Sequence, residues 1–259
     1  MLDRIGEPSA GRFEGFPEED DPVCVPQTKQ EAGATPPAST GAPGVAHPHP
    51  LAAWIRADGL VRRAPSTRSG LSLPSVPRQA RHGAAPREAA AALERQKAYL
   101  GECVKDCPDP RLRLALEHSL RALGMDRDCA GRALGWSNSD REMDCSGFVN
   151  TVYRNAGLPL EQQLDAANGT GTERMAAVLP RLPVGASPRT GDLILFNTDD
   201  PGAEGVNHVG ILIVDKFGNV GVLQNTNSGV RFTSLEDASR NGGPSWRDTF
   251  RCLRRPSFD

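Results

Sequence analysis

Long apolar runs and a basic, hydrophobic leader are both missing from this 259-residue sequence. Because no run of about 18 apolar residues occurs, we expect no transmembrane helix and no membrane partner. Residues 1–21 lack a basic start followed by an apolar core, so we expect no Sec signal peptide. The formal net charge is −2, which gives no electrostatic reason to expect nucleic acid as a partner.

Cysteines are few and irregularly spaced, which argues against a disulfide framework and against zinc. There are six of them. Cys103 and Cys107 are four residues apart, but no second close pair of ligands completes a metal site with them. We therefore expect no metal and no cofactor. Reduced, partly buried thiols are the favoured state, and a disulfide formed after export is the alternative.

Apolar residues are also scarce, at 38%, and prolines are unevenly distributed. Thirteen of the 22 prolines precede residue 90. We interpret residues 1–84 as a disordered or loosely packed Pro-rich arm, interrupted by one short apolar segment (51–63) that could form a brief helix. The folded domain is then expected to occupy residues 85–259.

Within this domain, helical patterns come first and strand patterns follow. Residues 86–106 are rich in Ala, Leu, Glu and Lys with a proline in the first turn, which predicts a helix. Leucines spaced three and four apart predict a second helix over 109–125, and a third is expected from Cys145 to Gly157. A short helix is possible at 173–179. Apolar runs separated by turn residues then predict five strands, at 192–196, 208–214, 220–224, 230–235 and 249–255. This order favours an α+β domain in which a helical N-terminal part packs on a small antiparallel sheet.

The third helix begins with a residue suited to nucleophilic catalysis. At the first turn of a helix, free N–H groups and the helix dipole lower the pKa of a thiol, and Cys145 would occupy this position. The same N–H groups could hold an oxyanion. Asp144 is placed to cap the helix, with Ser146 beside it. Cys145 is therefore our candidate nucleophile, against the alternative of a buried, inert cysteine.

A suitable base follows the cysteine in the chain. Of the five histidines, only His208 lies after Cys145, and it opens an apolar strand. A histidine there could lie within hydrogen-bond reach of the thiol and act as general base. A third residue must orient the imidazole. We prefer Gln224, at the end of the neighbouring strand, and leave Asn225 open as the alternative.

Three blocks in this order resemble the NlpC-type family of papain-like cell-wall peptidases. They are Asp144-Cys145-Ser146-Gly147-Phe148-Val149, Gly191-Asp192-Leu193-Ile194 and His208-Val209-Gly210-Ile211. The resemblance covers about half of the chain, from 130 to 235. It implies a papain-like α+β fold and hydrolysis of amide bonds in peptidoglycan stem peptides.

Two departures from the family pattern concern the substrate side and the third catalytic residue. The family usually has a tyrosine before the cysteine, whereas Trp136 lies in that region here. The third residue is often histidine in the family, but must be Gln or Asn here. We take Trp136 and Asn207 as candidates for contacts with substrate, together with the loop 197–207.

The resemblance and the missing Sec signal suggest an antibacterial role. A wall hydrolase without that signal fits an effector that is made in the cytoplasm and exported by another route to a target's periplasm or cell wall. A secretion-machine component and an immunity protein would then be its partners. The alternatives are a phage-type lysin, a deamidase, transglutaminase-like or thioesterase toxin using the same Cys–His pair, and a catalytically inactive binding domain.

Overall fold

The computed structural model describes residues 86–137, 142–165, 167–183, 186–200, 203–239 and 243–258. The Pro-rich arm and the brief helix expected at 51–63 lie outside these residues. Within the described part, no helix is long and apolar enough to cross a membrane.

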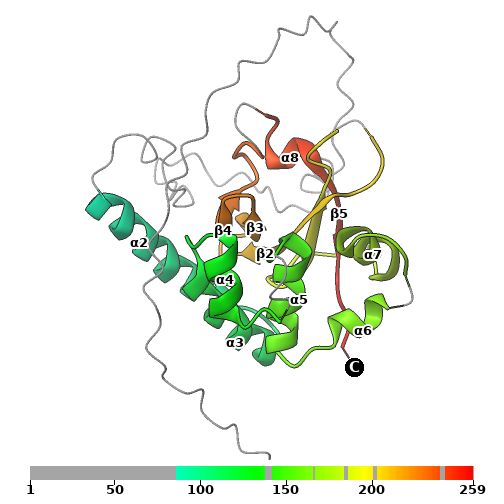
Figure 1. Cartoon of the computed structure of the whole chain (residues 1–259), viewed down its shortest axis with the longest axis horizontal. Coiled ribbons are helices and arrows are strands. Elements are labelled where there is room, and N and C mark those ends of the chain that lie inside the picture. The colour runs from blue at the N-terminus through cyan, green and yellow to red at the C-terminus, as the bar shows by residue number, and fades with distance from the viewer. Residues whose placement is uncertain are drawn as a thin grey trace, which may run out of the picture.

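Helices occupy the first half of the described chain, and strands dominate the second half (Figure 1). The helical segments are α2 (Pro86–Val104), α3 (Pro110–Ser119), η2 (Leu120–Ala122), α4 (Arg127–Leu134), α5 (Cys145–Asn155), α6 (Leu160–Leu164), α7 (Gly171–Val178) and α8 (Trp246–Thr249). The strands are β1 (Leu193–Phe196), β2 (His208–Val214), β3 (Val220–Thr226), β4 (Gly229–Ser234) and β5 (Phe250–Arg254).

The five strands form one antiparallel sheet in the order β4-β3-β2-β1-β5. The fold class predicted from the sequence is therefore confirmed, and the predicted strands match the observed ones to within a few residues. The sequence prediction missed α4, α6 and α8. All three are short, and short helices carry too few turns for a clear apolar period.

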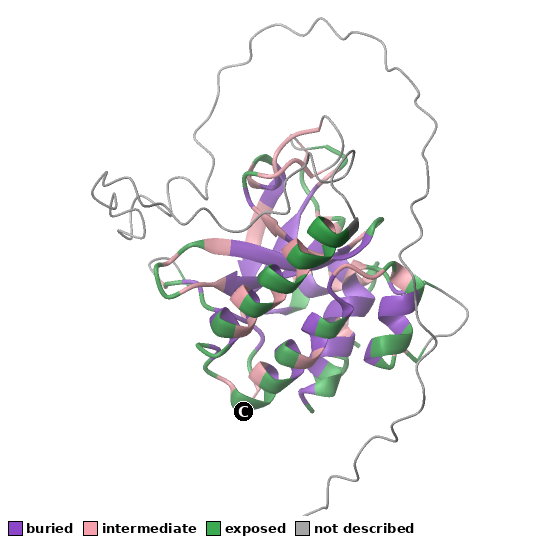
Figure 2. Cartoon of the chain, turned by 90° about the vertical axis from the view of Figure 1, so that its left-hand side faces the viewer, coloured by how far each residue is buried: buried purple, intermediate pink, exposed green. Residues whose placement is uncertain are grey.

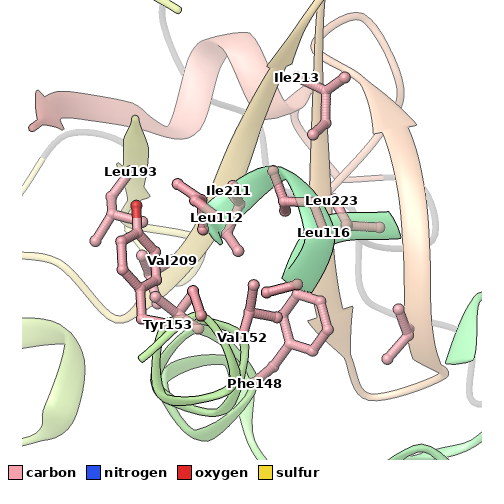
Figure 3. Packing of buried hydrophobic residues seen from close by; sticks show 14 of the residues in the cluster. Leu112, Leu116, Phe148, Val152, Tyr153, Leu193, Val209, Ile211, Ile213 and Leu223 are labelled. Carbon is pink, nitrogen blue, oxygen red and sulfur yellow. The ribbon is translucent and has the colours of Figure 1, made fainter. Parts of the chain in front are cut away.

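Each face of the sheet carries a buried cluster of its own. The strands between the two clusters are largely buried (Figure 2). We call the side packed by α2, α3 and α5 the helical face. There Phe148 and Val152 of α5 pack on Val209, Ile211 and Leu223 of the sheet (Figure 3). Side chains on a strand alternate between faces, so every second residue of β2 points the other way.

The opposite side, which we call the α8 face, has a smaller cluster. Its buried members come from the strands and from the segment around α8: Ile194, Phe196, Leu212, Val222, Leu235, Trp246, Phe250 and Leu253. The sheet is thus covered by long helices on one face and by a short helix and its loops on the other.

An ion pair ties the end of β5 to the start of β1. The buried carboxylate of Asp192 accepts two hydrogen bonds of 2.7 Å from the Arg255 guanidinium. The side-chain hydrogen bond to Asp192 raises the pKa of Arg255, so the guanidinium stays charged. This bidentate contact joins the end of the edge strand β5 to the start of its neighbour β1.

Candidate active site

The first turn of α5 is organised around its N-cap, Asp144. One carboxylate oxygen accepts hydrogen bonds from the Gly147 N–H (2.6 Å) and from the Ser146 hydroxyl (2.9 Å). The backbone N–H groups of Cys145 and Ser146 have no acceptor within the helix, because the first four N–H groups of any α-helix lack one. Asp144 and Ser146 therefore define the helix start at which Cys145 stands.

Trp136 packs on the same turn. A Cβ placed on Gly147 would lie 2.8 Å from the Trp136 ring, so the indole approaches this helix closely only because residue 147 is glycine. The half-buried Trp136 thus lies beside the nucleophile's helix, in the region where the sequence predicts substrate contacts.

The thiol of Cys145 is free and partly buried. Its sulfur lies 3.8 Å from the hydroxyl oxygen of Thr172, a buried residue in the first turn of α7. Burial raises the pKa of the Cys145 thiol, and the nearby charge of Asp144 raises it further. Hydrogen bonds from the Val209 and Ser146 backbone and from Thr172 lower the pKa and offset part of this effect.

Thr172 is a neighbour of the thiol that the sequence analysis missed. Gly171 allows its approach, since a Cβ at that position would lie 2.4 Å from the Ser146 hydroxyl oxygen. The available signal was the capping box of Thr170 and Glu173, which marks the start of α7 but not its place beside α5.

His208 opens β2 and lies on the α8 face. Its ring centroid is 5.0 Å from that of Trp246 and 6.1 Å from that of Phe196. Burial among these rings lowers the pKa of His208 to about 4, although the hydrogen bond with Gln224 raises it and opposes this effect. The imidazole is therefore neutral at neutral pH.

Gln224 fixes the tautomer of that imidazole. The Gln224 side chain donates from Nε2 to the Thr233 hydroxyl at 2.6 Å, which leaves its carbonyl oxygen Oε1 facing His208 Nε2 at 2.7 Å. A carbonyl can only accept, so His208 Nε2 carries the hydrogen. The other ring nitrogen, Nδ1, then has a free lone pair and can accept a proton from a thiol.

Gly210 gives Gln224 access to the histidine. Residues 208 and 210 point to the same face, and a Cβ at Gly210 would lie 2.3 Å from Val222 Cγ1 and 3.1 Å from Gln224 Cβ. The Gln224 side chain therefore passes over the space that a side chain at 210 would fill.

The backbone ladder between β2 and β3 stops before the strands end. Their pairing ends at Ile211–Leu223, whereas β2 stays paired with β1 as far as His208 and β3 with β4 as far as Thr226. We call the unpaired stretch, residues 208–210 and 224–226, the ladder break. It lies at the end of the sheet that carries His208.

The ladder break lets the thiol approach the strand. The Leu212 N–H points toward β1, where it bonds to the Asp192 carbonyl. N–H directions alternate along a strand, so the Val209 N–H points toward β3. It is not paired in the ladder there, and backbone hydrogen bonding by Val209 lowers the pKa of the Cys145 thiol. The Cys145 thiol at the start of α5 is thus placed near Val209, the residue that follows His208 in β2.

Asn225, the alternative orienting residue, has a different role in the structure. Its amide donates to the Met143 carbonyl at 2.5 Å, and its own carbonyl oxygen has no hydrogen-bond partner among the described residues. Of the two residues left open by the sequence, the one hydrogen-bonded to His208 is Gln224. Asn225 holds the segment that leads into Cys145.

Arg127 supports this segment from α4. Its guanidinium donates to the Thr226 carbonyl at 3.0 Å and to the Asn227 side chain at 2.9 Å, and it lies 3.7 Å from the Glu142 carboxylate. The turn after β3 and the residues before Cys145 are thereby connected through one side chain.

The loop before β2 is closed by its own side chains. Asn207, which the sequence analysis proposed as a substrate contact, accepts hydrogen bonds from the Thr198 N–H (2.9 Å) and hydroxyl (3.1 Å). Its side-chain oxygen therefore shapes the loop beside His208. No group of three or more His, Cys, Asp or Glu side chains that could hold a metal ion is found in the described part of the chain.

The described cysteines other than Cys145 lie away from this chemistry. Cys103, Cys107 and Cys252 are free thiols, as expected from the sequence, and burial raises the pKa of each. Cys129 is disulfide-bonded, so the expectation of reduced thiols is wrong for this residue.

Comparison with known proteins finds a sequence family whose model matches the part of the chain that carries this site. The model described as the NlpC/P60 family matches residues 131–254. No curated protein matches the chain. Among solved structures, the chain is similar to a Staphylococcus aureus protein described as similar to lipoprotein, NLP/P60 family, with 23% identity and a TM-score of 0.35. That match covers 57% of this chain and 41% of the other, so this chain spans about two fifths of that protein.

Proposed function

Residues 131–254 belong to the NlpC/P60 family of cysteine peptidases, and from this premise we propose that the protein hydrolyses amide bonds in peptidoglycan stem peptides. The observation that carries the proposal is the arrangement around His208. Gln224 holds the hydrogen on Nε2, and the Cys145 thiol lies against the N–H of the next residue, Val209.

The reaction begins with proton transfer within this pair. His208 Nδ1 accepts the thiol proton as the Cys145 sulfur attacks the carbonyl carbon of the scissile amide. The negative charge that develops on the carbonyl oxygen is stabilised by the free N–H groups at the start of α5. The imidazolium that forms is stabilised by its hydrogen bond to the Gln224 carbonyl.

Acyl transfer to water completes the cycle. His208 returns its proton to the leaving amine, the C–N bond breaks, and the acyl group remains on the Cys145 sulfur as a thioester. His208 then takes a proton from water, which attacks the thioester. Release of the carboxylic acid regenerates the thiol.

The test is incubation of the purified full chain with peptidoglycan fragments and, in parallel, with a glutamine-bearing protein. We expect the fragments to gain one water per amide cut, as mass spectrometry of the products would show. Modification of glutamine side chains with intact fragments would instead support a deamidase or transglutaminase. Cys145→Ala is the inactive variant, and Cys252→Ala is the matched control for loss of a thiol.

An antibacterial role is the finer part of the proposal. The long Pro-rich segment 1–84 expected from the sequence supports it, because such an arm could be recognised during delivery or docking. Expression in the periplasm should then lyse the cell with the wild-type chain and not with Cys145→Ala. Lysis by both would contradict a catalytic toxin. An immunity protein that blocks access to Cys145 is the expected partner in the producing cell.

A further inference from the structure

The partly buried imidazole of His208 is flanked by aromatic rings from two separate segments. Phe196 is its cross-strand neighbour on β1, and Trp246 comes from α8, which is far away in the sequence. The Trp246 ring is tilted by 35° to the imidazole, with 5.0 Å between the ring centroids, and meets Phe196 edge-on at 63°. Trp246 is itself only 3% exposed, so water does not reach the histidine through it.

Several contacts outside the catalytic strands hold Trp246 in place. Ser245 and Asp248 form a capping box at the start of α8. The Trp246 N–H donates to the Asp237 carbonyl at 2.9 Å, and the next N–H in the chain donates to the Leu235 carbonyl at 2.8 Å. The backbone that carries Trp246 is therefore attached to the turn after β4, independently of His208.

We propose that Trp246 is a positioning residue that excludes water from the α8-face side of His208 and keeps the imidazole neutral, with Nδ1 available to the thiol. The proposal rests on the proposed function in that His208 acts as the base. Trp246 touches the base and not the reacting atoms, so its contribution passes through the histidine.

The charged groups near His208 oppose one another, so we attribute its neutral state to the apolar rings of Phe196 and Trp246. Arg127 of α4 opposes protonation, and Asp144 of α5 favours it. The hydrogen-bonding partner on β3, Gln224, is uncharged, and so are Phe196 on β1 and Trp246 on α8. Desolvation is the largest cause of the lowered pKa of His208, and it is also the largest cause of the raised pKa of the partly buried Cys145 thiol. The resting pair is then a neutral thiol and a neutral imidazole, not an ion pair.

The experiment is an NMR titration of the His208 ring in the full chain, assigned with His208→Gln. We expect a midpoint near 4 in the wild type. Replacing Trp246 with Leu should raise it by about one pH unit or more, toward the ordinary value, because water gains access to the ring. Trp246→Phe keeps an aromatic wall with a small gap and should raise the midpoint less. If Trp246→Leu does not fold, the smaller shift in Trp246→Phe carries the test.

Leu253→Ala is the matched control, since it truncates another buried residue of the α8-face cluster. It should lower the free energy of unfolding and leave the histidine midpoint unchanged. A wild-type midpoint near the ordinary value would overturn the proposal, as would equal midpoints in the wild type and both Trp246 variants. The titration needs no substrate, so it can succeed even if the peptidoglycan assay fails. In an active enzyme, the acidic limb of kcat/KM should move with the same midpoint.

Discussion

The two faces of the sheet differ in what they contribute. The helical face holds the large apolar cluster and presents Cys145 at the start of α5. The α8 face holds a small cluster and presents His208 with its partner Gln224. Cys145 and His208 are thus supported by separate cores on the two sides of the sheet. The comparison teaches that the larger apolar cluster and the proposed base lie on different sides of one sheet.

The largest expected effect is on the nucleophile of the helical face. Cys145→Ala should lower kcat by about 10⁴-fold or more, because the acyl-enzyme cannot form. Its free energy of unfolding should stay close to that of the wild type. Product release from peptidoglycan fragments measures the first quantity and urea denaturation the second. Activity that survives in Cys145→Ala would remove this residue from the mechanism, while Cys252→Ala should behave as the wild type.

A pair of truncations compares the two cores directly. Phe148→Ala opens a cavity in the fully buried helical-face cluster and should lower the free energy of unfolding by about 3–5 kcal/mol. Leu253→Ala, on the α8 face and 8% exposed, should cost about 2–3 kcal/mol. Denaturant titrations of both variants provide the measurement. Equal losses would show that the two clusters support the fold equally.

Acid should weaken the fold through the α8 face. The pKa of His208 falls from 6.5 to about 4 on burial, so between these values the unfolded chain binds a proton that the folded chain does not. Stability therefore decreases as pH falls through this window, by up to about 3 kcal/mol. The drop should be smaller in His208→Gln. Identical pH dependence in the two chains would contradict a buried neutral imidazole.

The smallest effect separates Gln224 from Asn225. Gln224→Leu removes the acceptor for His208 Nε2–H, and losing one buried hydrogen bond should lower kcat by about 10- to 100-fold. Asn225→Leu should act differently, because its partner is the Met143 carbonyl. We expect it to lower the free energy of unfolding and to leave the pKa of His208 unchanged. A histidine titration that shifts only in Asn225→Leu would reverse the two assignments.

Much of the site could be predicted because its two main residues stand at the ends of clear elements. Cys145 follows a capping residue and begins an apolar helix, and His208 begins an apolar strand. The choice between Gln224 and Asn225 needed the register of β3 against β2, since neighbours on a strand point to opposite faces. Composition and periodicity do not reveal the register of one strand against another.

Trp246 and Thr172 could not be predicted for a related reason. Each lies on a short helix. The local sequence identifies the N-cap of that helix but not the element on which the helix packs. Thr172 is 27 residues from Cys145 in sequence, and only the packing of α7 against α5 brings them together. Contacts of this kind depend on tertiary structure, which local propensity does not specify.

The ladder break also makes the active site sensitive to chain length. The turn between β2 and β3 is closed by Asp215, whose carboxylate accepts hydrogen bonds from the Phe217 and Asn219 N–H groups at 2.8 Å. If a one-residue deletion in the turn slid β3, Gln224 would point to the helical face and Asn225 would take its place on the side of His208. A shift of two residues would return Gln224 to the α8 face but move its amide two residues along the strand, away from His208. A change in the length of this hairpin that shifts β3 by an odd number of residues therefore turns Gln224 away from His208. This holds even though the hairpin tip lies at the opposite end of the strands from the thiol.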